Sequence, residues 1–373
     1  MKVLHVYKTY VPDNFTGVPR VIHSLAEAQV DQGIASEVFA LTESPAAGSM
    51  PVGRHVVRRA RSRVSVASTA LSVSAFRSFR DAVAEADLVH YHFPWPMGDL
   101  LHLAHGRRRP AIATYHSDIV RQRFLKRLYA PVMERFLSDM DRIVATSPDY
   151  ARTSPVLARH AARLAVIPIG IPDRAPPDEE AVAPWRERVG SGFFLFVGSL
   201  RYYKGIGYLV EAARLSGLPV VIAGRDEEGE LAGVSLPRNV TFLREVGEDD
   251  KDALLALSRA FVLPSHLRSE AFGVALLEAA RARRPMISCE IGSGTSYVNR
   301  NGETGLVVPP RRPDVFAAAM ARLARDDTAA AAMGEAARAR YEALFTDTAM
   351  ARAYRDLYVS VLAGHGKAAG AAG

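Results

Sequence analysis

The chain has 373 residues, of which 49% are hydrophobic and 23% charged, close to an average folded protein. That length exceeds one ordinary core and suits two α/β domains. The apolar runs fall short of the roughly 20 residues of a membrane-spanning helix. Met1 leads directly into a strand-like run, Val3–Tyr7, which argues against a secretory signal. The single cysteine, Cys289, excludes an internal disulfide, so we expect a cytoplasmic location.

The positive charge is concentrated in the first half of the chain. Residues 1–170 contain 22 lysines and arginines against 14 acidic residues, a net charge of +8, while the remainder contains 25 against 26. This asymmetry favours an anionic partner for the first half: phospholipid headgroups, a pyrophosphate-linked acceptor or nucleic acid. A surface whose excess charge only confers solubility accounts for the same counts.

Short β-type runs alternate with helical patterns along the chain. Helical periodicity covers Val18–Gln32 and Ala75–Glu85, and the acidic, proline-rich segment Arg174–Pro184 interrupts the alternation once. The predicted strands are Val3–Tyr7, Ser36–Leu41, Leu88–His92, Ala111–Tyr115, Arg142–Thr146, Phe193–Val197, Pro219–Ala223, Val240–Phe242, Phe261–Leu263, Pro285–Ser288 and Gly305–Val308. This alternation predicts an α/β fold with parallel sheets covered on both faces.

We therefore predict two Rossmann-like, doubly wound domains that face each other across a cleft and bind ligands at the carboxyl ends of their strands. The N-terminal domain is predicted over residues 1–170 and the C-terminal domain over 171–346. A helix over residues 347–363 is expected to pack back on the N-terminal domain. The Gly/Ala-rich residues 364–373 are expected to form a disordered tail.

The most specific segment is residues 263–279, LPSHLRSEAFGVALLEA, where a strand and a loop precede a helix predicted to begin near Ala271. Glu270 and Glu278 stand eight residues apart, a little over two helical turns, which predicts both carboxylates on one face. Unpaired backbone N–H groups at the helix start form a cradle for a diphosphate; the residues are Ala271, Phe272, Gly273 and Val274. The alternative is that Glu270 only caps the helix and Glu278 faces solvent.

This segment resembles the signature of glycosyltransferase family 4, in which two glutamates stand eight residues apart around a Phe-Gly pair. The resemblance covers nearly the whole chain and, within the family, is closest to bacterial O-antigen mannosyl- and rhamnosyltransferases that use GDP-sugars. The phrases that carry this closer resemblance are LHVYKTY at 4–10, TYHSDIV at 114–120, LRYYKG at 200–205 and ISCEIGSGTSYVN at 287–299.

The resemblance implies a GT-B fold and a retaining glycosyltransferase that needs no metal or other cofactor. It implies transfer of a mannose- or rhamnose-type hexose from a GDP-sugar to a polyprenyl-pyrophosphate-linked saccharide in O-antigen or related polysaccharide synthesis, at the inner face of the cytoplasmic membrane and without nucleic acid. Two alternatives stay open. One is a GT-B enzyme with another donor or acceptor, such as a UDP-sugar transferase or an epimerase; the other is a non-enzymatic basic protein that binds a membrane or nucleic acid.

Two basic residues lie in a loop predicted between a strand and a helix. Lys204 and Arg201 stand where cations neutralise a departing nucleoside diphosphate, and Gly198 is expected to border the donor. Many family members carry an arginine directly after this glycine, but this chain has Ser199, so Arg201 is the candidate substitute. The alternative is a pair of surface cations on a loop.

Further donor contacts follow from the resemblance. Gly17, in the turn after the first strand, lets the backbone approach the donor, although the chain has Thr16-Gly17 where the family usually has two glycines. The resemblance places the ribose at Glu278 and the transferred sugar beside Glu270. The remaining contacts that it implies are Gly170, at the hinge between the domains, Gly224 and Arg225.

Several polar residues of the first half are candidates for contacts with the sugar or the acceptor. His116 matches the histidine that in the family lies near the donor sugar, and its expected role is hydrogen bonding or transition-state polarisation. His90 and His92 alternate on one strand and could ligate a metal, although a structural or acceptor-side role is favoured for both. Asp118 is either an acceptor-side carboxylate or a helix N-cap.

Residues 119–137, IVRQRFLKRLYAPVMERFL, combine helical apolar spacing with five cations: Arg121, Arg123, Lys126, Arg127 and Arg135. A basic amphipathic helix is typical of contact with an anionic membrane surface. A calmodulin-type or nucleic-acid partner, or a core helix with one solvated face, fits the same pattern. Because the implied acceptor is lipid-linked, we expect a peripheral membrane contact.

Overall fold

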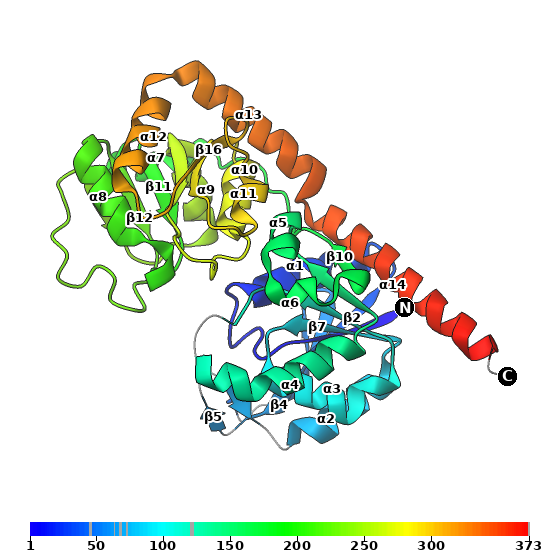
Figure 1. Cartoon of the computed structure of the whole chain (residues 1–373). Helices are drawn as coiled ribbons and strands as arrows, with labels where there is room; N and C mark the ends of the chain where they lie inside the picture. Colours follow the sequence, from blue (N-terminus) through cyan, green and yellow to red (C-terminus); the bar gives the residue numbers. More distant parts are fainter. Residues whose placement is uncertain (45–46, 63, 67–68, 72–73, 120–122, 372–373) are drawn as a thin grey trace. The chain divides into compact units, whose positions relative to one another are not determined.

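The computed structural model describes residues 1–371 with gaps at 45–46, 63, 67–68, 72–73 and 120–122; it also leaves undescribed the side chains of residues 64–66, 69–71, 123–127 and 366–371. The chain forms two compact units. Unit 1 comprises Met1–Pro172 and Asp347–Gly373, and unit 2 comprises Asp173–Thr346. Helices flank the sheet of each unit (Figure 1). Within the described ranges, no helix is both long and apolar enough to cross a membrane.

Unit 1 is built on a sheet of eight described strands in the order β10-β9-β8-β7-β1-β2-β4-β3, and a separate hairpin joins β5 to β6. All neighbours in the large sheet are parallel except β3 and β4. The strands are β1 Lys2–Val6, β2 Ala35–Thr42, β3 Gly48–Val52, β4 His55–Arg61, β5 Val64–Val66, β6 Thr69–Leu71, β7 Leu88–Phe93, β8 Ala111–Tyr115, β9 Arg142–Ala145 and β10 Leu164–Val166.

The last helix of the chain, α14, belongs to unit 1 and packs against α1. It runs to Ala371, through most of the tail that the sequence predicts to be disordered. Its start is tied to the end of the first segment, since the Asp347 N–H donates to the Ile171 carbonyl at 3.0 Å. The helices are α1 Val18–Val30, α2 Ser74–Glu85, α3 Pro96–His105, α4 Arg123–Asp139, α5 Pro148–Thr153, α6 Pro155–Ala158 and α14 Asp347–Ala371, with 3₁₀ turns η1 Gly106–Arg108 and η2 Ala161–Arg163.

Unit 2 is built on six described parallel strands in the order β13-β12-β11-β14-β15-β16. These strands are short and almost wholly buried, which is why they appear in the sequence as continuous apolar runs. The elements are α7 Glu179–Val189, β11 Phe194–Val197, η3 Tyr202–Lys204, α8 Ile206–Ser216, β12 Val220–Ala223, β13 Val240–Leu243, α9 Glu248–Leu257, β14 Ala260–Leu263, α10 Val274–Arg281, β15 Met286–Cys289, α11 Thr295–Val298, β16 Gly305–Val308, α12 Pro313–Arg325 and α13 Asp327–Leu344.

The order of the parallel strands reverses between β1 and β7 in unit 1 and between β11 and β14 in unit 2. Doubly wound sheets bind ligands outside the carboxyl ends of the strands at this reversal, because the loops of the two adjacent strands lead away to opposite faces. In unit 2 the segments at that point are residues 198–205 and 264–273. These are the segments to which the sequence assigns the donor.

Two glycines let backbones approach closely near this point. Gly205 has φ +72° at the start of α8, and a Cβ there would lie 2.3 Å from the Pro264 carbonyl oxygen. Gly224 has φ +150°, and its Cβ would lie 2.0 Å from the Gly198 carbonyl oxygen. Only glycine fits such positions without strain. Both glycines are therefore required by the packing of the loops, whatever ligand binds there.

Candidate active site

The centre of the candidate site is an ion pair between Lys204 and Glu270. The Nζ of Lys204 contacts Oε2 of Glu270, and the Ser265 hydroxyl donates to the same oxygen at 3.2 Å. The Lys204 and Glu270 side chains are only 14% and 10% exposed. Burial alone would lower the pKa of Lys204, but the attraction of Glu270 outweighs it and raises the pKa. A cation is thus held in place at the strand reversal of unit 2.

The helix that follows Glu270 begins three residues later than predicted. α10 starts at Val274, because Gly273 adopts φ +83°, a left-handed conformation that interrupts the helix. Ala271 and Phe272 belong to the preceding loop, where the Ala271 carbonyl accepts from the Gly294 N–H at 2.8 Å and the Phe272 side chain is buried. Glu270 is therefore not a helical residue. The prediction that two turns of one helix align Glu270 with Glu278 is wrong.

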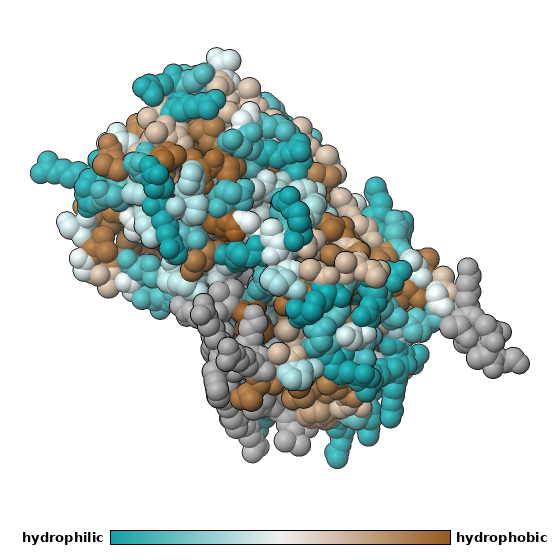
Figure 2. Space-filling view, viewed as in Figure 1, coloured by the Kyte–Doolittle hydropathy of each residue, from teal (hydrophilic) through white to brown (hydrophobic). Residues whose placement is uncertain are grey.

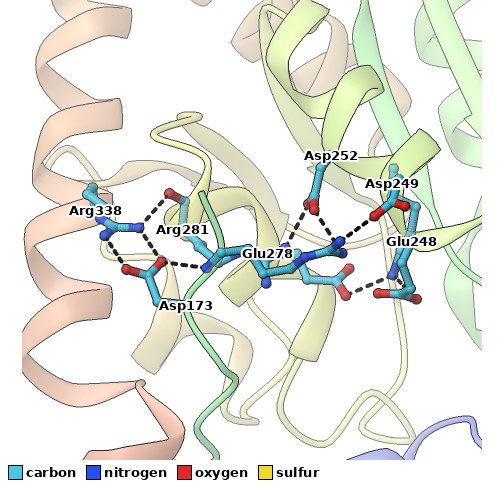
Figure 3. A network of polar contacts seen from close by, with 9 residues as sticks. Asp173, Glu248, Asp249, Asp252, Glu278, Arg281 and Arg338 are labelled. Carbon is cyan, nitrogen blue, oxygen red and sulfur yellow. Dashed lines mark hydrogen bonds and ion pairs between the residues drawn. The ribbon is translucent and has the colours of Figure 1, made fainter. Parts of the chain in front are cut away.

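Glu278 lies on α10 with a partner of its own. Its Oε1 is 2.9 Å from Nζ of Lys251, which also contacts Glu248 at 2.8 Å. Glu278 is 6% exposed, so the alternative of a solvent-facing residue is also wrong. A second group of ion pairs lies beside it around Asp252, which contacts Arg281 at 2.7 Å (Figure 3). To accept ribose hydroxyls, Glu278 has to share its carboxylate with Lys251.

Arg201 and Arg225 lie in the loops that follow β11 and β12. Arg201 is 42% exposed and forms an ion pair with Glu227, which also lies 3.5 Å from the Ser199 hydroxyl. Arg225 is 63% exposed and pairs with Glu245 at 2.5 Å. Each cation thus already has a carboxylate partner. Lys204 is the more buried of the two cations predicted beside the diphosphate.

Two predicted donor glycines lie in unit 1. Gly17 has φ +63° and precedes α1, and a Cβ at this residue would meet nothing within 4 Å. Gly170 donates its N–H to the Met350 sulfur of α14 at 3.3 Å. The division between the units falls after Pro172, two residues beyond the predicted boundary. Open space beside Gly17 is consistent with a ligand approaching the backbone there.

His116 follows β8 and lies at one end of a row of buried histidines. Its Nε2 is 3.0 Å from Nδ1 of His92, and Nε2 of His92 is 3.1 Å from Nδ1 of His5. His90 and His92 are stacked with ring centroids 4.3 Å apart. Burial lowers the pKa of His116 to about 3, so this imidazole is neutral near pH 7. His92 is only 2% exposed, so contact with an acceptor would need a rearrangement.

Asp118 ties down the loop after His116. Its Oδ1 accepts from the Tyr115 hydroxyl at 2.9 Å and from the Ser154 hydroxyl at 2.8 Å, while its N–H donates to the Tyr150 hydroxyl at 2.6 Å. α4 begins at Arg123, so Asp118 is not its N-cap and that alternative is wrong. The structure gives this carboxylate a role in ordering the loop.

Two groups of described residues bring potential metal ligands within 4.8 Å of one another: His5 with His90 and His92, and His23 with Glu27 and His55. In the first group, both ring nitrogens of each histidine already have hydrogen-bond partners. In the second, His55 contacts Glu27 at 2.6 Å and Tyr10 at 2.9 Å. A metal would have to displace these hydrogen bonds, which favours the structural role expected for His90 and His92.

Sequence reasoning missed Ser265 and Lys251, the partners of the two glutamates. Ser265 stands five residues before Glu270 in the same loop, so its position was an available signal. Lys251 stands 27 residues before Glu278 on another helix, and no local pattern connects them. His5 and Gln29 were also missed. The one signal for His5 is a polar residue inside an apolar strand.

Comparison with known proteins places the chain in a family. The sequence profile Glycosyltransferase Family 4 matches residues 15–174, and Glycosyl transferases group 1 matches residues 178–340. The chain is 50% identical over 353 residues to D-rhamnosyltransferase WbpZ of Pseudomonas aeruginosa, spanning 93% of this chain and 92% of that one. It is 42% identical over 370 residues to O-antigen chain mannosyltransferase C of Escherichia coli, spanning 97% and 99%. Sucrose-phosphate synthase of Thermosynechococcus elongatus has a similar structure, with a TM-score of 0.79 and 21% identity over 97% and 99% of the two chains.

The two doubly wound units and these full-length similarities define a GT-B glycosyltransferase. The chain belongs to glycosyltransferase family 4, as its motifs indicate. It is therefore an enzyme that acts on a nucleotide-sugar donor and a saccharide acceptor. The alternative of a non-enzymatic membrane- or nucleic-acid-binding protein is wrong.

Proposed function

We propose that this enzyme transfers a mannose- or rhamnose-type hexose from a GDP-sugar to a polyprenyl-pyrophosphate-linked saccharide during O-antigen or related polysaccharide synthesis. The observation that carries the proposal is the Lys204–Glu270 ion pair at the strand reversal of unit 2, where a sugar diphosphate finds a fixed cation beside a carboxylate. The choice of sugar is supported by relatives that are named as a D-rhamnosyltransferase and an O-antigen mannosyltransferase.

In this proposal the diphosphate binds at the start of α10, where helical N–H groups lack partners within the helix. Lys204 offsets the negative charge that grows on the diphosphate as the glycosidic bond breaks. Glu270 accepts hydrogen bonds from the transferred sugar, Glu278 from the ribose, and His116 contacts the sugar. Further donor contacts are proposed for Gly17, Gly170, Gly198, Arg201, Gly224, Arg225, Ala271, Phe272, Gly273 and Val274, with His92 and Asp118 toward the acceptor.

The proposed reaction retains the anomeric configuration and needs no metal. The bond between the anomeric carbon and the phosphate oxygen breaks, and the acceptor hydroxyl oxygen attacks the same face. The leaving phosphate oxygen takes the hydroxyl proton, so no side chain has to act as a base. A charged Lys204 suits this scheme, since the charge to be stabilised forms on the leaving group.

Thermal melting with GDP and with UDP tests the donor. A ligand at a hundred times its Kd stabilises the folded state by about 2.7 kcal/mol, a shift of roughly 5–10 °C for a unit of this size. We expect GDP to produce this shift, UDP to produce little, and the Glu278→Ala variant to respond less to GDP. An equal or larger shift with UDP would contradict the choice of guanine.

We also propose that unit 1 contacts an anionic membrane surface. The predicted amphipathic segment overlaps α4, on which Leu128 is 67% exposed and the Arg135 side chain 63% exposed. The side chains of Arg121, Arg123, Lys126 and Arg127 lie outside the described residues. Hydrophobic and hydrophilic residues are interspersed over the coloured part of the face in Figure 2. Because clustered lysines and arginines are attracted to anionic lipid, charge is expected to contribute more to binding than apolar area.

Co-sedimentation with vesicles tests the membrane contact. We expect binding to vesicles rich in phosphatidylglycerol, no binding to pure phosphatidylcholine, and release at high salt, because surface charges are screened. A double variant with Leu128→Ser and Arg135→Ser should bind less. Arg186→Ser in unit 2, which also removes a half-exposed cation, is the matched control. Equal binding to both vesicle types would exclude an electrostatic contact.

A further inference from the structure

A continuous chain of hydrogen-bonded side chains runs through the core of unit 1 and begins at His116. From His116 it passes to His92 at 3.0 Å and from there to His5 at 3.1 Å. Nε2 of His5 lies 2.9 Å from Oε1 of Gln29 on α1, and the Gln29 amide nitrogen donates to the Tyr358 hydroxyl of α14 at 3.1 Å. The chain thus links a proposed sugar-binding residue to Gln29 of α1 and Tyr358 of α14, which lie 329 residues apart in sequence.

The histidines of this chain are neutral near pH 7. Burial lowers the pKa of His5 to about 4 and that of His116 to about 3, and the pKa of His92 lies well below its usual value for the same reason. A neutral imidazole has one N–H donor and one acceptor nitrogen. A histidine that donates at one nitrogen therefore has to accept at the other. The direction of one hydrogen bond fixes the direction of all the others.

Gln29 sets that direction. Its Oε1 lies 2.6 Å from the Ser36 hydroxyl, a usual length for O–H···O and too short for an amide N–H donor, so this atom is the carbonyl oxygen. Nε2 of His5 consequently carries the proton and donates to Gln29. Nδ1 of His5 then accepts from His92, whose Nδ1 accepts from Nε2 of His116. His116 is left as the tautomer with its proton on Nε2 and a lone pair on Nδ1.

α14 helps to hold the amide in this orientation. The Tyr358 hydroxyl, which accepts from Gln29, lies 2.7 Å from Nδ1 of His90, and Nε2 of His90 lies 2.6 Å from the Thr114 hydroxyl. A hydroxyl that accepts from the amide is free to donate to His90. Turning the Gln29 amide over would place its N–H groups against Ser36 and His5 and reverse the histidine chain.

Among the residues that the structure describes, the hydrogen bond of the His116 ring is the one that Nε2 makes to His92. We propose that Gln29 is a positioning residue that acts through His5 and His92 to fix His116 as the Nε2–H tautomer, so that Nδ1 accepts a hydrogen bond from a sugar hydroxyl. This inference rests on the proposed contact of His116 with the sugar. It also requires one tautomer of His116. The opposite tautomer would present an N–H donor at Nδ1 and would favour a hydrogen-bond acceptor as its partner.

Nitrogen NMR of the full-length protein with ¹⁵N-labelled histidine tests the tautomer directly, because protonated and unprotonated ring nitrogens resonate far apart. The His116 signals are identified by their loss in His116→Gln. We expect the proton on Nε2 of His116 in the wild type near pH 7.5. A proton on Nδ1, or rapid exchange between the two tautomers, would overturn the proposal.

Two substitutions of Gln29 test its control over His116. Gln29→Met keeps the size of the side chain and removes both polar atoms, so we expect mixed tautomers at His116 and a kcat for GDP release from GDP-mannose lowered about tenfold to a hundredfold with little change in KM. Gln29→Glu retains an acceptor for His5 whether or not it is protonated, and should restore the tautomer and most of kcat. Restored turnover in Gln29→Glu without the restored tautomer would also count against the proposal.

The sugar contact of His116 and the role of Gln29 are excluded by different results. If His116→Gln turns over GDP-mannose as fast as the wild type, the sugar contact of His116 is wrong, while the tautomer spectra still decide the role of Gln29. If Gln29→Met does not fold, the wild-type spectrum alone decides the tautomer. His365→Ala removes an exposed histidine and serves as the control for both measurements.

Discussion

Lys204→Ala is expected to lower kcat/KM by a factor of about 10²–10³. A fixed cation that stabilises charge developing in the transition state contributes roughly 2–4 kcal/mol, and the effect falls on kcat because the charge is largest after the glycosidic bond begins to break. The structure strengthens this expectation, since the Lys204 side chain is mostly buried and is held in place by Glu270. Steady-state kinetics of GDP release from GDP-mannose measure the change.

A loss of activity in Lys204→Ala has to be separated from a loss of folding. Removing the lysine leaves Glu270 mostly buried without its counter-charge, which costs stability. The double variant Lys204→Met with Glu270→Gln removes both charges, so we expect its melting temperature to recover while its activity stays low. Arg214→Ala removes an exposed cation of α8 that pairs with Glu211. It should change neither the melting temperature nor the activity. Unchanged turnover in Lys204→Ala would exclude its role.

Acidification below about pH 6.5 is expected to destabilise unit 1 steeply. His5 and His116 have folded-state pKa values of about 4 and about 3, lowered by burial from 6.5, and burial also lowers the pKa values of His90 and His92 well below 6.5. The unfolded chain therefore binds protons first as the pH falls. The free energy of unfolding contributed by these histidines is fully present above pH 6.5. It decreases as the pH falls, until the folded-state pKa is reached. Each histidine contributes about 1.4 kcal/mol per pH unit in this range.

This pH effect can be assigned to unit 1 by fluorescence. The two tryptophans fall in different units, and Trp95 of unit 1 is 2% exposed, so the Trp185→Phe variant reports the unfolding of unit 1 alone. Urea titrations at pH 7.5, 6.5 and 5.5 give the free energy of unfolding. Among the described residues, Gln29, Thr114 and Tyr358 are hydrogen-bonded to these histidines and Tyr354 packs on His90, and none of the four titrates in this range. The charge of His55 also lowers the pKa of His5. A flat profile would mean that these histidines have ordinary pKa values, and His365→Ala should leave the slope unchanged.

The parallel strands were predictable because each is a short buried run between polar segments. Val220–Ala223 and Phe194–Val197 were placed within a residue. The β3–β4 hairpin was not predicted, since β3 contains Pro51 and is largely exposed, which removes the apolar signal. The start of α10 was predicted too early because, in the sequence, Gly273 resembles a glycine tolerated inside a helix. In the structure its positive φ makes it the last residue of the loop, directly before the helix.

The site was predictable where residues stand in one loop and not where the fold joins distant segments. Glu270 and Lys204 were predicted as site residues in two separate motifs. Their ion pair was not predicted, because it depends on β11 and β14 being neighbours in the sheet. The partner of Glu278 comes from α9, and the partner of His92 comes from β1, 87 residues away. Long-range pairing of this kind leaves no periodic trace in the sequence.

Unit 1 is discontinuous, and this affects how the chain matures on the ribosome. α14 is synthesised after unit 2, yet Tyr358 supplies the hydrogen bonds that hold Gln29 and His90. Domains generally fold in the order of their synthesis. Here the unit that is started first has to wait for α14, whereas unit 2 is complete once Thr346 has emerged. Gln29 and His90 of the nascent first segment therefore lack their Tyr358 partner until α14 has been synthesised.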